Sequence, residues 1–532
     1  MIVLNIILTI LFSLFSTAIL SYISMAVMIG PWIHSIIVIA SSLIFSCMRS
    51  KISSESRIKS ISLITAGSSI GGILATGCGF AFPTLYFLNK DMFNEWLHNP
   101  PYFIAIMALV SFSAGALGLL IADTFEHKLI AVDKLPFPIG ELSYNLIALK
   151  NNASQTYQLI AGSVLSAGYS IIMSMYSVSQ KVLFSSSFAI KGLNIPAIGM
   201  PTYEFPLLIS IGFIAGSLIM IPLAIGLISK IVIINPAHSH FFKYLNYNDF
   251  SFAFISGMVF YGALISLLGI PTFINSIIKK IKALYNSGHT SFKPSGNVSY
   301  IQWALVLLIT FLFLTWFKFS ILLQLYLVVF TILCAYQLLV IGGEMGMAPV
   351  ARFATFVMMP ALFIFNPNYE QLTLISTFVE VCGGVAVDIL FGRKLAQLSG
   401  LESKKVKNFQ WLGLIVSALS VGIIFWILIT KFGLGSTSLI AQRGQSRALT
   451  IQFQNFDFYA MTLGALYGSL LKEFKTNPIM VLGGILMPME WVLVLIVGGA
   501  LAAIIKDAKE YQIFWSGVFA TNSVIMIIKA LI

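Results

Sequence analysis

The chain has 532 residues, of which 58% are hydrophobic and only 9% charged, with a formal net charge of +12 and a mean hydropathy of +0.94. This composition excludes a soluble globular protein and predicts a chain that is solvated mainly by lipid. The basic residues lie in short segments between apolar runs, which is typical of cytoplasmic loops near anionic lipid and argues against nucleic-acid binding. We therefore expect a multi-pass integral protein of the cell (inner) membrane.

Apolar runs of about 18 residues or more, each enough to cross a ~30 Å hydrocarbon core as a helix, recur along the chain. Examples are 2–28, 30–48, 60–89, 102–122 and 512–532. The first run has no basic residue before it and leads directly into the second, so we expect a retained helix rather than a cleaved signal. We predict an all-α polytopic protein with about 16 transmembrane helices.

Several apolar segments are broken by Pro, Gly or charge, namely 131–152, 183–206, 230–250 and 477–490. Each could be a re-entrant hairpin, a half-helix or a loop, and we expect such broken segments near the centre of the protein. The basic segments 49–59, 279–293 and 393–407 are predicted to be cytoplasmic loops, so the more acidic segment 90–101 would lie on the other side.

Two stretches far apart in the chain share the pattern G-x-x-x-G-S-L: SIGFIAGSL at 210–218 and TLGALYGSL at 462–470. Further matches follow in the same order along the chain, and they pair Asn89 with Asn366, Asp123 with Asp388, and Asn235 with Asn477. We predict two sequence-related halves, 1–270 and 301–532, joined by a basic central loop at 271–300. Whether the repeat is parallel or inverted stays open. The glycine-rich pair itself is expected to supply close helix packing.

The segment KLPFPIGELSYNLIALKNN at 134–152 is the first candidate site. Pro136 and Pro138 prevent a continuous helix, and Gly140 is expected to act as a flexible corner just before a new helix begins. The positive end of that helix would suit a substrate carboxylate. Glu141 and Asn145, four residues apart, would share one face of the helix, with Tyr144 beside them. An interfacial turn explains the same pattern equally well.

A second break, GGEMGMAP at 342–349, separates Glu344 from Arg352. If the helix continued, the eight-residue spacing would place both on one face as a buried ion pair, either at a site or as a purely structural contact. Glu380 and Asp388 have the same spacing. Ionisable groups in hydrocarbon cost ~2.5 to 3.5 kcal/mol and usually face a bundle interior or a water-filled path. The carboxylates Asp123, Glu344, Glu380 and Asp388 are therefore candidates for a substrate-binding or proton-coupling site. Nothing in the sequence selects among them.

Other chemistries lack their signatures. The sequence contains neither a G-x-x-x-x-G-K-[ST] motif nor an H-E-x-x-H motif, and its six histidines are scattered. The cysteines Cys47, Cys78, Cys334 and Cys382 have no CxxC spacing and are expected to be packing residues. We therefore predict no catalytic residue, no metal site and no cofactor. Energy for transport would come from an ion gradient.

Three segments carry a resemblance to a known family. The segment that follows Asp123 and contains LPFPIGEL resembles the LPFPSG-type signature of the oligopeptide transporter (OPT) family. The stretch 380–410, which we expect to be a small-residue helix ending in Asp388, then a basic loop and another helix, is similar to the family's second-half segment. Residues 459–488 resemble its C-terminal pattern. The resemblance implies about sixteen helices, two related halves and proton-coupled uptake of small peptides, or of metal chelates in the yellow-stripe-like branch.

The chain also departs from that family. Ile139 stands where the family usually has Ser, and the segment after Asp388 lacks the family's second Asp, Lys-Thr-Gly and Pro-Arg pattern. The choice between peptide and metal chelate therefore stays open.

The favoured hypothesis is a secondary active transporter that imports small oligopeptides with protons by alternating access. The alternative of the same family is a metal-siderophore or metal-chelate carrier. An alternative of another class, a polytopic membrane enzyme, would need a catalytic cluster on a long aqueous loop, and 178–206 and 271–300 contain none. The expected partners are a small peptide or chelate, protons and lipid, and a homodimer is one option for assembly.

Overall fold

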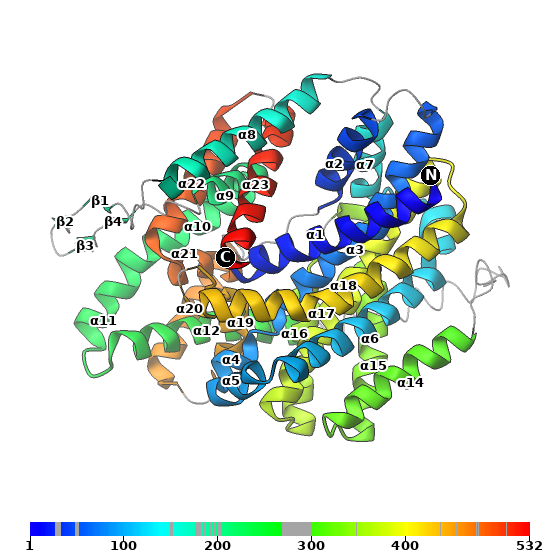
Figure 1. The fold of residues 1–532 in the computed structure, drawn as a ribbon. Helices are drawn as coiled ribbons and strands as arrows, with labels where there is room; N and C mark the ends of the chain where they lie inside the picture. The colour runs from blue at the N-terminus through cyan, green and yellow to red at the C-terminus, as the bar shows by residue number, and fades with distance from the viewer. Residues whose placement is uncertain are drawn as a thin grey trace. The chain divides into compact units, whose positions relative to one another are not determined.

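The computed structural model describes residues 1–26, 33–47, 53–148, 153–175, 182–184, 188–190, 193–195, 198–199, 205–268, 300–346, 348–436, 438–453, 456–474, 476, 478–506 and 508–531. Within these ranges nearly all regular structure is helical (Figure 1). Seven helical stretches there are long and apolar enough to cross a membrane: Ile2–Ala26, Ser54–Leu88, Pro100–Val132, Met220–Phe241, Ile321–Glu344, Tyr369–Leu398 and Ser403–Phe432. The prediction of an all-α membrane protein is confirmed at this level. The count of about sixteen crossings stays a prediction.

The chain divides into two compact units that are interleaved in sequence. Unit 1 comprises Met1–Met25, Ile29–Lys150 and Ala263–Thr430, and unit 2 comprises Ala26–Met28, Asn151–Gly262 and Lys431–Ile532. Each unit therefore draws chain from both predicted halves, 1–270 and 301–532. The predicted central loop at 271–299 lies outside the described residues, and the duplication itself stays a prediction.

Helix α17 (Tyr369–Leu398) forms the centre of unit 1, and its apolar stretch is fully buried. Its neighbours include α3 (Ser54–Ala81), α6 (Pro100–Glu126), α7 (Pro138–Ala148), α15 (Ile321–Met345) and α16 (Val350–Phe365) (Figure 1). The other elements of this unit are α1 (Ile2–Ala26), α2 (His34–Cys47), α4 (Thr84–Leu88), α5 (Lys90–His98), η1 (His127–Val132), α14 (Tyr300–Trp316) and α18 (Ser403–Phe432).

Small residues allow this close approach to α17. A Cβ added at Gly118 of α6 would overlap the carbonyl oxygen of Cys382, and one added at Gly77 of α3 would lie 3.0 Å from a Val381 methyl group. On α17 itself, a Cβ at Gly384 would lie 2.9 Å from Ile73. Without a hydrophobic driving force between helices in lipid, contact at this distance is a main source of helix association.

In unit 2, helices from the middle of the chain pair in a nested order with helices from its C-terminal part. Helix α8 (Ala153–Met175) packs on α23 (Ala508–Leu531), α9 (Phe205–Ala215) on α22 (Met489–Ile504), and α10 (Ser217–Ser229) on α21 (Pro478–Leu486), while α12 (Tyr247–Leu268) meets α20 (Phe458–Glu473). This unit also contains η2 (Lys230–Ile234), α11 (Asn235–Phe241) and α19 (Gln442–Ile451). Four short strands, Val182–Phe184, Phe188–Ile190, Leu193–Ile195 and Ile198–Gly199, pair antiparallel as β1 with β4 and β2 with β3.

Each of these four crossings has a glycine on both helices. The pairs are Gly162 and Gly517, Gly212 and Gly498, Gly226 and Gly484, and Gly257 and Gly464. At every one of these positions an added Cβ would overlap a backbone carbonyl oxygen of the opposite helix. The prediction that the G-x-x-x-G-S-L segments supply close helix packing is thus confirmed for both of their first glycines.

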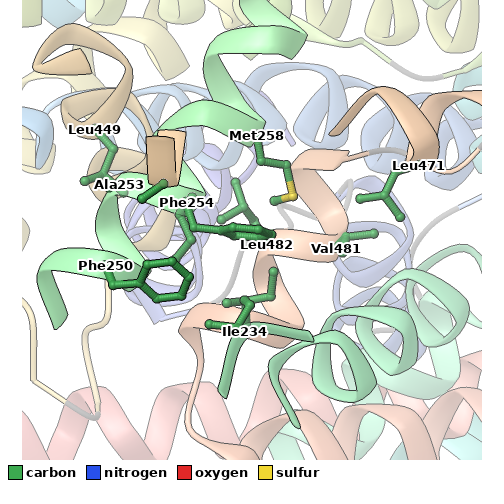
Figure 2. Packing of buried hydrophobic residues seen from close by; sticks show 12 residues of the cluster. Ile234, Phe250, Ala253, Phe254, Met258, Leu449, Leu471, Val481 and Leu482 are labelled. Atoms are coloured by element: carbon green, nitrogen blue, oxygen red, sulfur yellow. The ribbon is translucent and has the colours of Figure 1, made fainter. Parts of the chain in front are cut away.

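A cluster of buried apolar side chains fills the space between α12, α20 and α21 in unit 2. Figure 2 shows Phe254 of α12 and Leu482 of α21 close together within it. Met258, Leu471 and Val481 extend the cluster, and each is at most 6% exposed. Because the interior of a protein is closely packed, neither backbone at a glycine crossing can move aside without opening voids. We therefore expect these crossings to be rigid.

Two of the predicted polar loops are wrong in their boundaries. Segment 393–407 is mostly helical: Arg393 and Lys394 belong to α17 and Lys407 to α18, so that 399–402 forms the connection. The prediction that the helix ends at Asp388 is therefore wrong, since α17 continues to Leu398. The N-terminal part of 49–59 is undescribed, but α3 begins at Ser54 and contains Arg57 and Lys59. Segment 90–101 contains the helix α5, capped by Asn89, whose side chain accepts a hydrogen bond from the Met92 N–H. Segment 279–293 lies outside the described residues.

Candidate functional site

Three ionisable side chains are buried along α17. Glu380, Asp388 and Arg393 are 0%, 1% and 3% exposed. Because an α-helix rises about 1.5 Å per residue, these three positions span about 20 Å along α17. That is a large part of the ~30 Å hydrocarbon core of a membrane. Because such groups are costly in hydrocarbon, each needs a partner or a polar path.

Arg393 is the centre of a charge cluster that joins three helices. Its guanidinium forms ion pairs with Asp123 and Glu126 of α6, and its Nε–H donates to Gln410 Oε1 of α18 at 2.9 Å. Lys407 Nζ, also on α18, lies 3.5 Å from Asp123 Oδ1 and 4.0 Å from Glu126 Oε2. Two positive and two negative charges sum to zero, which is the condition under which a low-dielectric interior tolerates them.

Gln410 is held in the orientation that this cluster requires. Its Nε2–H donates to the carbonyl oxygen of Ile389 at 3.0 Å, which leaves Oε1 facing Arg393. The prediction that 393–407 is a solvated basic loop missed this role for Arg393. The missed signal is the apolar sequence Ile-Leu-Phe-Gly between Asp388 and Arg393, which continues the helix without a break.

A cavity of about 180 Å³ lies beside the charge cluster, where α6 continues as the π-helical turn η1. Its polar wall is formed by Glu126, His127, Arg393, Gln397 and Ser403, and the remainder is apolar. The cavity gives the charge cluster room for water or a small polar group.

Asp388 has a different environment from Arg393. The Ser69 hydroxyl of α3 donates to Asp388 Oδ2 at 2.7 Å, and Nδ1 of His34 on α2 lies 3.6 Å from Asp388 Oδ1. The His34 ring packs edge-on against Phe391, with 6.0 Å between the ring centroids. All of these side chains are buried. The structure thus brings together a carboxyl group, an imidazole and a hydroxyl from three helices, and of these only the carboxyl group was predicted from the sequence.

The two predicted helix breaks contact each other inside unit 1. Residues 134–137 are not helical, with positive φ at Lys134 and Phe137, and α15 ends where Gly346 has φ +71°. The Phe137 N–H donates to the carbonyl oxygen of Gly343 at 2.8 Å. A Cβ added at Gly346 would lie 3.3 Å from Pro138. The sequence predicted both breaks, whereas their direct contact is a result of the tertiary structure.

The role predicted for Gly140 is wrong. Helix α7 begins at Pro138, so Gly140 lies within its first turn rather than at a corner before it. A Cβ there would lie 2.6 Å from the carbonyl oxygen of Phe391, so the glycine permits α7 to approach α17. Glu141, on the same turn, lies 3.5 Å from Lys394 Nζ of α17.

The remaining candidates on the first break are less enclosed. Pro136 lies exposed in the extended segment before α7. On α7 itself, Tyr144 is half-buried and Asn145 is exposed. These three residues therefore lie at the edge of the contact between the two helix breaks. They are not part of the buried clusters around Arg393 and Asp388.

The predicted ion pair between Glu344 and Arg352 is also wrong. The left-handed conformation of Gly346 ends α15, and α16 begins only at Val350, so the two residues do not share a helix. Both side chains are exposed, and no ion pair joins them among the described contacts. The assumption of a continuous helix caused the error, since a glycine with positive φ turns the chain.

Cys78, Cys334 and Cys382 are buried and carry free thiols, as expected for packing residues. Comparison with known proteins adds no assignment: no protein-family model and no curated protein matches the sequence. What the chain does must therefore be argued from the arrangement of its own residues.

Proposed function

We propose that the protein is a secondary active transporter that imports small oligopeptides together with protons by alternating access. The contact between the two helix breaks carries this proposal. Backbone groups freed by a broken helix at membrane depth are tolerated only where protein or a water-filled cavity surrounds them, and transporters use such breaks to bind polar substrates. Here the two breaks meet beside α17, the helix with three buried ionisable groups.

The first turn of α7 supplies the recognition element in this proposal. The N–H groups of Gly140 and Glu141 already donate to the carbonyl oxygen of Phe137, so the positive end of the helix dipole would be the feature that favours a negatively charged group. A peptide carries such a group, a carboxylate, at its C-terminus. The ammonium group of Lys394, whose Nζ lies 3.5 Å from Glu141 Oε1, adds a positive charge next to that turn. The bond from Phe137 to Gly343 closes the space between the breaks, and we expect it to open and re-form as access alternates.

The resemblance to the OPT family supports this proposal, with about sixteen helices and two related halves as its structural part. Metal chelates are the second candidate substrate, because Ile139 and the segment after Asp388 depart from the family pattern and leave the substrate class open. Iron-siderophore complexes carry several oxygen donors and could use the same positive helix end.

Uptake by the purified protein in liposomes tests the proposal. We expect a mixture of di- to pentapeptides, or else iron-siderophore complexes, to accumulate only when an inward proton gradient is imposed. A protonophore should abolish accumulation, and protein-free liposomes supply the background. If neither substrate class enters faster with the gradient than without it, the proposed function is wrong.

A further inference from the structure

Asp388 of α17 lies next to a second titratable side chain, His34 of α2. His34 Nδ1 lies 3.6 Å from Asp388 Oδ1, and the Ser69 hydroxyl donates to Oδ2 at 2.7 Å. The three residues come from α17, α2 and α3, and none is more than 1% exposed. A short adjustment of either side chain would bring the imidazole and the carboxyl group into a hydrogen bond.

The other charged groups on the surrounding helices are engaged elsewhere or lie away from this contact. Asp123 and Glu126 of α6 pair with Arg393, and Glu141 of α7 pairs with Lys394. Further charged side chains on α17 and on the helices packed around it are Glu370 and Glu380 of α17, Glu55, Arg57 and Lys59 of α3, Glu344 of α15, Arg352 of α16, and Lys404, Lys405, Lys407 and Lys431 of α18. In the described part of the chain, His34 is the ionisable group within ion-pair distance of Asp388.

The net charge of this pair depends on how many protons it holds. With one proton the pair is neutral overall, either as a carboxylic acid beside a neutral imidazole or as a carboxylate beside an imidazolium. Transfer between these forms breaks the O–H bond at Asp388 and forms an N–H bond at His34. Without the proton the pair carries one negative charge, which is expensive in a buried site. Loading a proton therefore determines whether this part of α17 can stay enclosed.

We propose that Asp388 and His34 together hold the proton that drives transport, with the Ser69 hydroxyl orienting the carboxyl group. The assignment rests on the proposed function for its role in coupling, but the shared proton is a property of the pair alone. A coupled pair titrates as a unit, so a change at either member alters the behaviour of both. Intramembrane pairs of this kind are typical of proton relays.

Infrared difference spectroscopy of the purified protein in lipid, titrated over pH, tests the pair without any substrate. We expect a band from a protonated carboxyl group that disappears as the pH rises, and Asp388→Asn should remove this band. His34→Gln should move the midpoint of the titration by about one pH unit or more, because it removes the group that shares the proton. Ser69→Ala keeps both titratable groups and should move the midpoint less.

His98→Gln is the matched control, since this exposed histidine of α5 contacts the backbone carbonyl of Asn94 and forms no ion pair with a carboxylate in the part of the chain that the structure describes. It should leave the midpoint where the wild type has it. The inference is overturned if the band persists in Asp388→Asn, or if His34→Gln and Ser69→Ala both titrate like the wild type.

Transport measurements separate this inference from the proposed function. In His34→Gln the pH profile of uptake should shift by the same amount as the infrared midpoint. If wild-type protein transports its substrate and His34→Gln leaves that profile unchanged, the pair is not the coupling site. If the wild type transports nothing while the infrared band behaves as expected, the proposed function fails and the shared proton stands.

Discussion

Arg393→Met is expected to destabilise the protein by about 3 to 5 kcal/mol, the cost of breaking a buried ion pair by removing one partner. Among the described residues, the substitution leaves Asp123 and Glu126 with the Lys407 ammonium, which is 3.5 and 4.0 Å away from them and partly exposed. It also removes the donor to Gln410 Oε1. Denaturant or thermal unfolding in lipid-detergent micelles measures the loss.

Two further variants establish that charge, not volume, causes this loss. Adding Asp123→Asn and Glu126→Gln to Arg393→Met removes the unpaired charges and should restore a large part of the stability. Lys405→Met is the surface control, because Lys405 forms an exposed pair with Glu402 and should cost at most about 1 kcal/mol. An Arg393→Met protein as stable as the Lys405→Met protein would show that the cluster does not stabilise the fold.

Gly162→Ala and Gly168→Ala are expected to have opposite effects although both glycines lie on α8. A Cβ at Gly162 would overlap the carbonyl oxygen of Phe514 on α23, whereas nothing lies within 4 Å of a Cβ at Gly168. Gly162→Ala must therefore separate the two backbones, and we expect a loss of about 2 kcal/mol or more. Gly168→Ala should be neutral or gain up to about 1 kcal/mol from helix propensity.

Unfolding of the two variants side by side measures this difference, and the amount of folded protein recovered in membranes gives a second readout. Because the substitution and the helix are the same, differences in propensity cancel to a first approximation. Equal stabilities would mean that α8 and α23 do not cross at Gly162 and Gly517.

The sequence was sufficient for features that depend on local chemistry. Two prolines at 136 and 138 predict a broken helix whatever surrounds them, and the segment is broken. Glycines spaced four apart predict helix contact, and Gly212 and Gly464 both lie at crossings. Composition alone identified a membrane protein, because no soluble fold could expose so much apolar surface.

Features that depend on distant partners could not be predicted in the same way. Ser69 and Asp388 are 319 residues apart, and no spacing rule connects them to each other or to His34. Arg393 looked like a loop residue because the rule for cytoplasmic loops counts positive charges and cannot see Asp123 and Glu126 on another helix. The interleaved units differ from the predicted halves for a related reason: a repeat concerns sequence, whereas a compact unit depends on which helices pack together.

Proton movement driven by substrate tests the central claim most directly. Wild-type protein is reconstituted into liposomes that contain a pH-sensitive dye, and the mixture of di- to pentapeptides is added outside without any imposed gradient. We predict that peptide entry acidifies the lumen in the wild type. Asp388→Asn should lose this acidification while it still exchanges labelled peptide for unlabelled peptide across the membrane. Equal acidification by the wild type and Asp388→Asn, or peptide entry without acidification in the wild type, would contradict proton-coupled transport through Asp388.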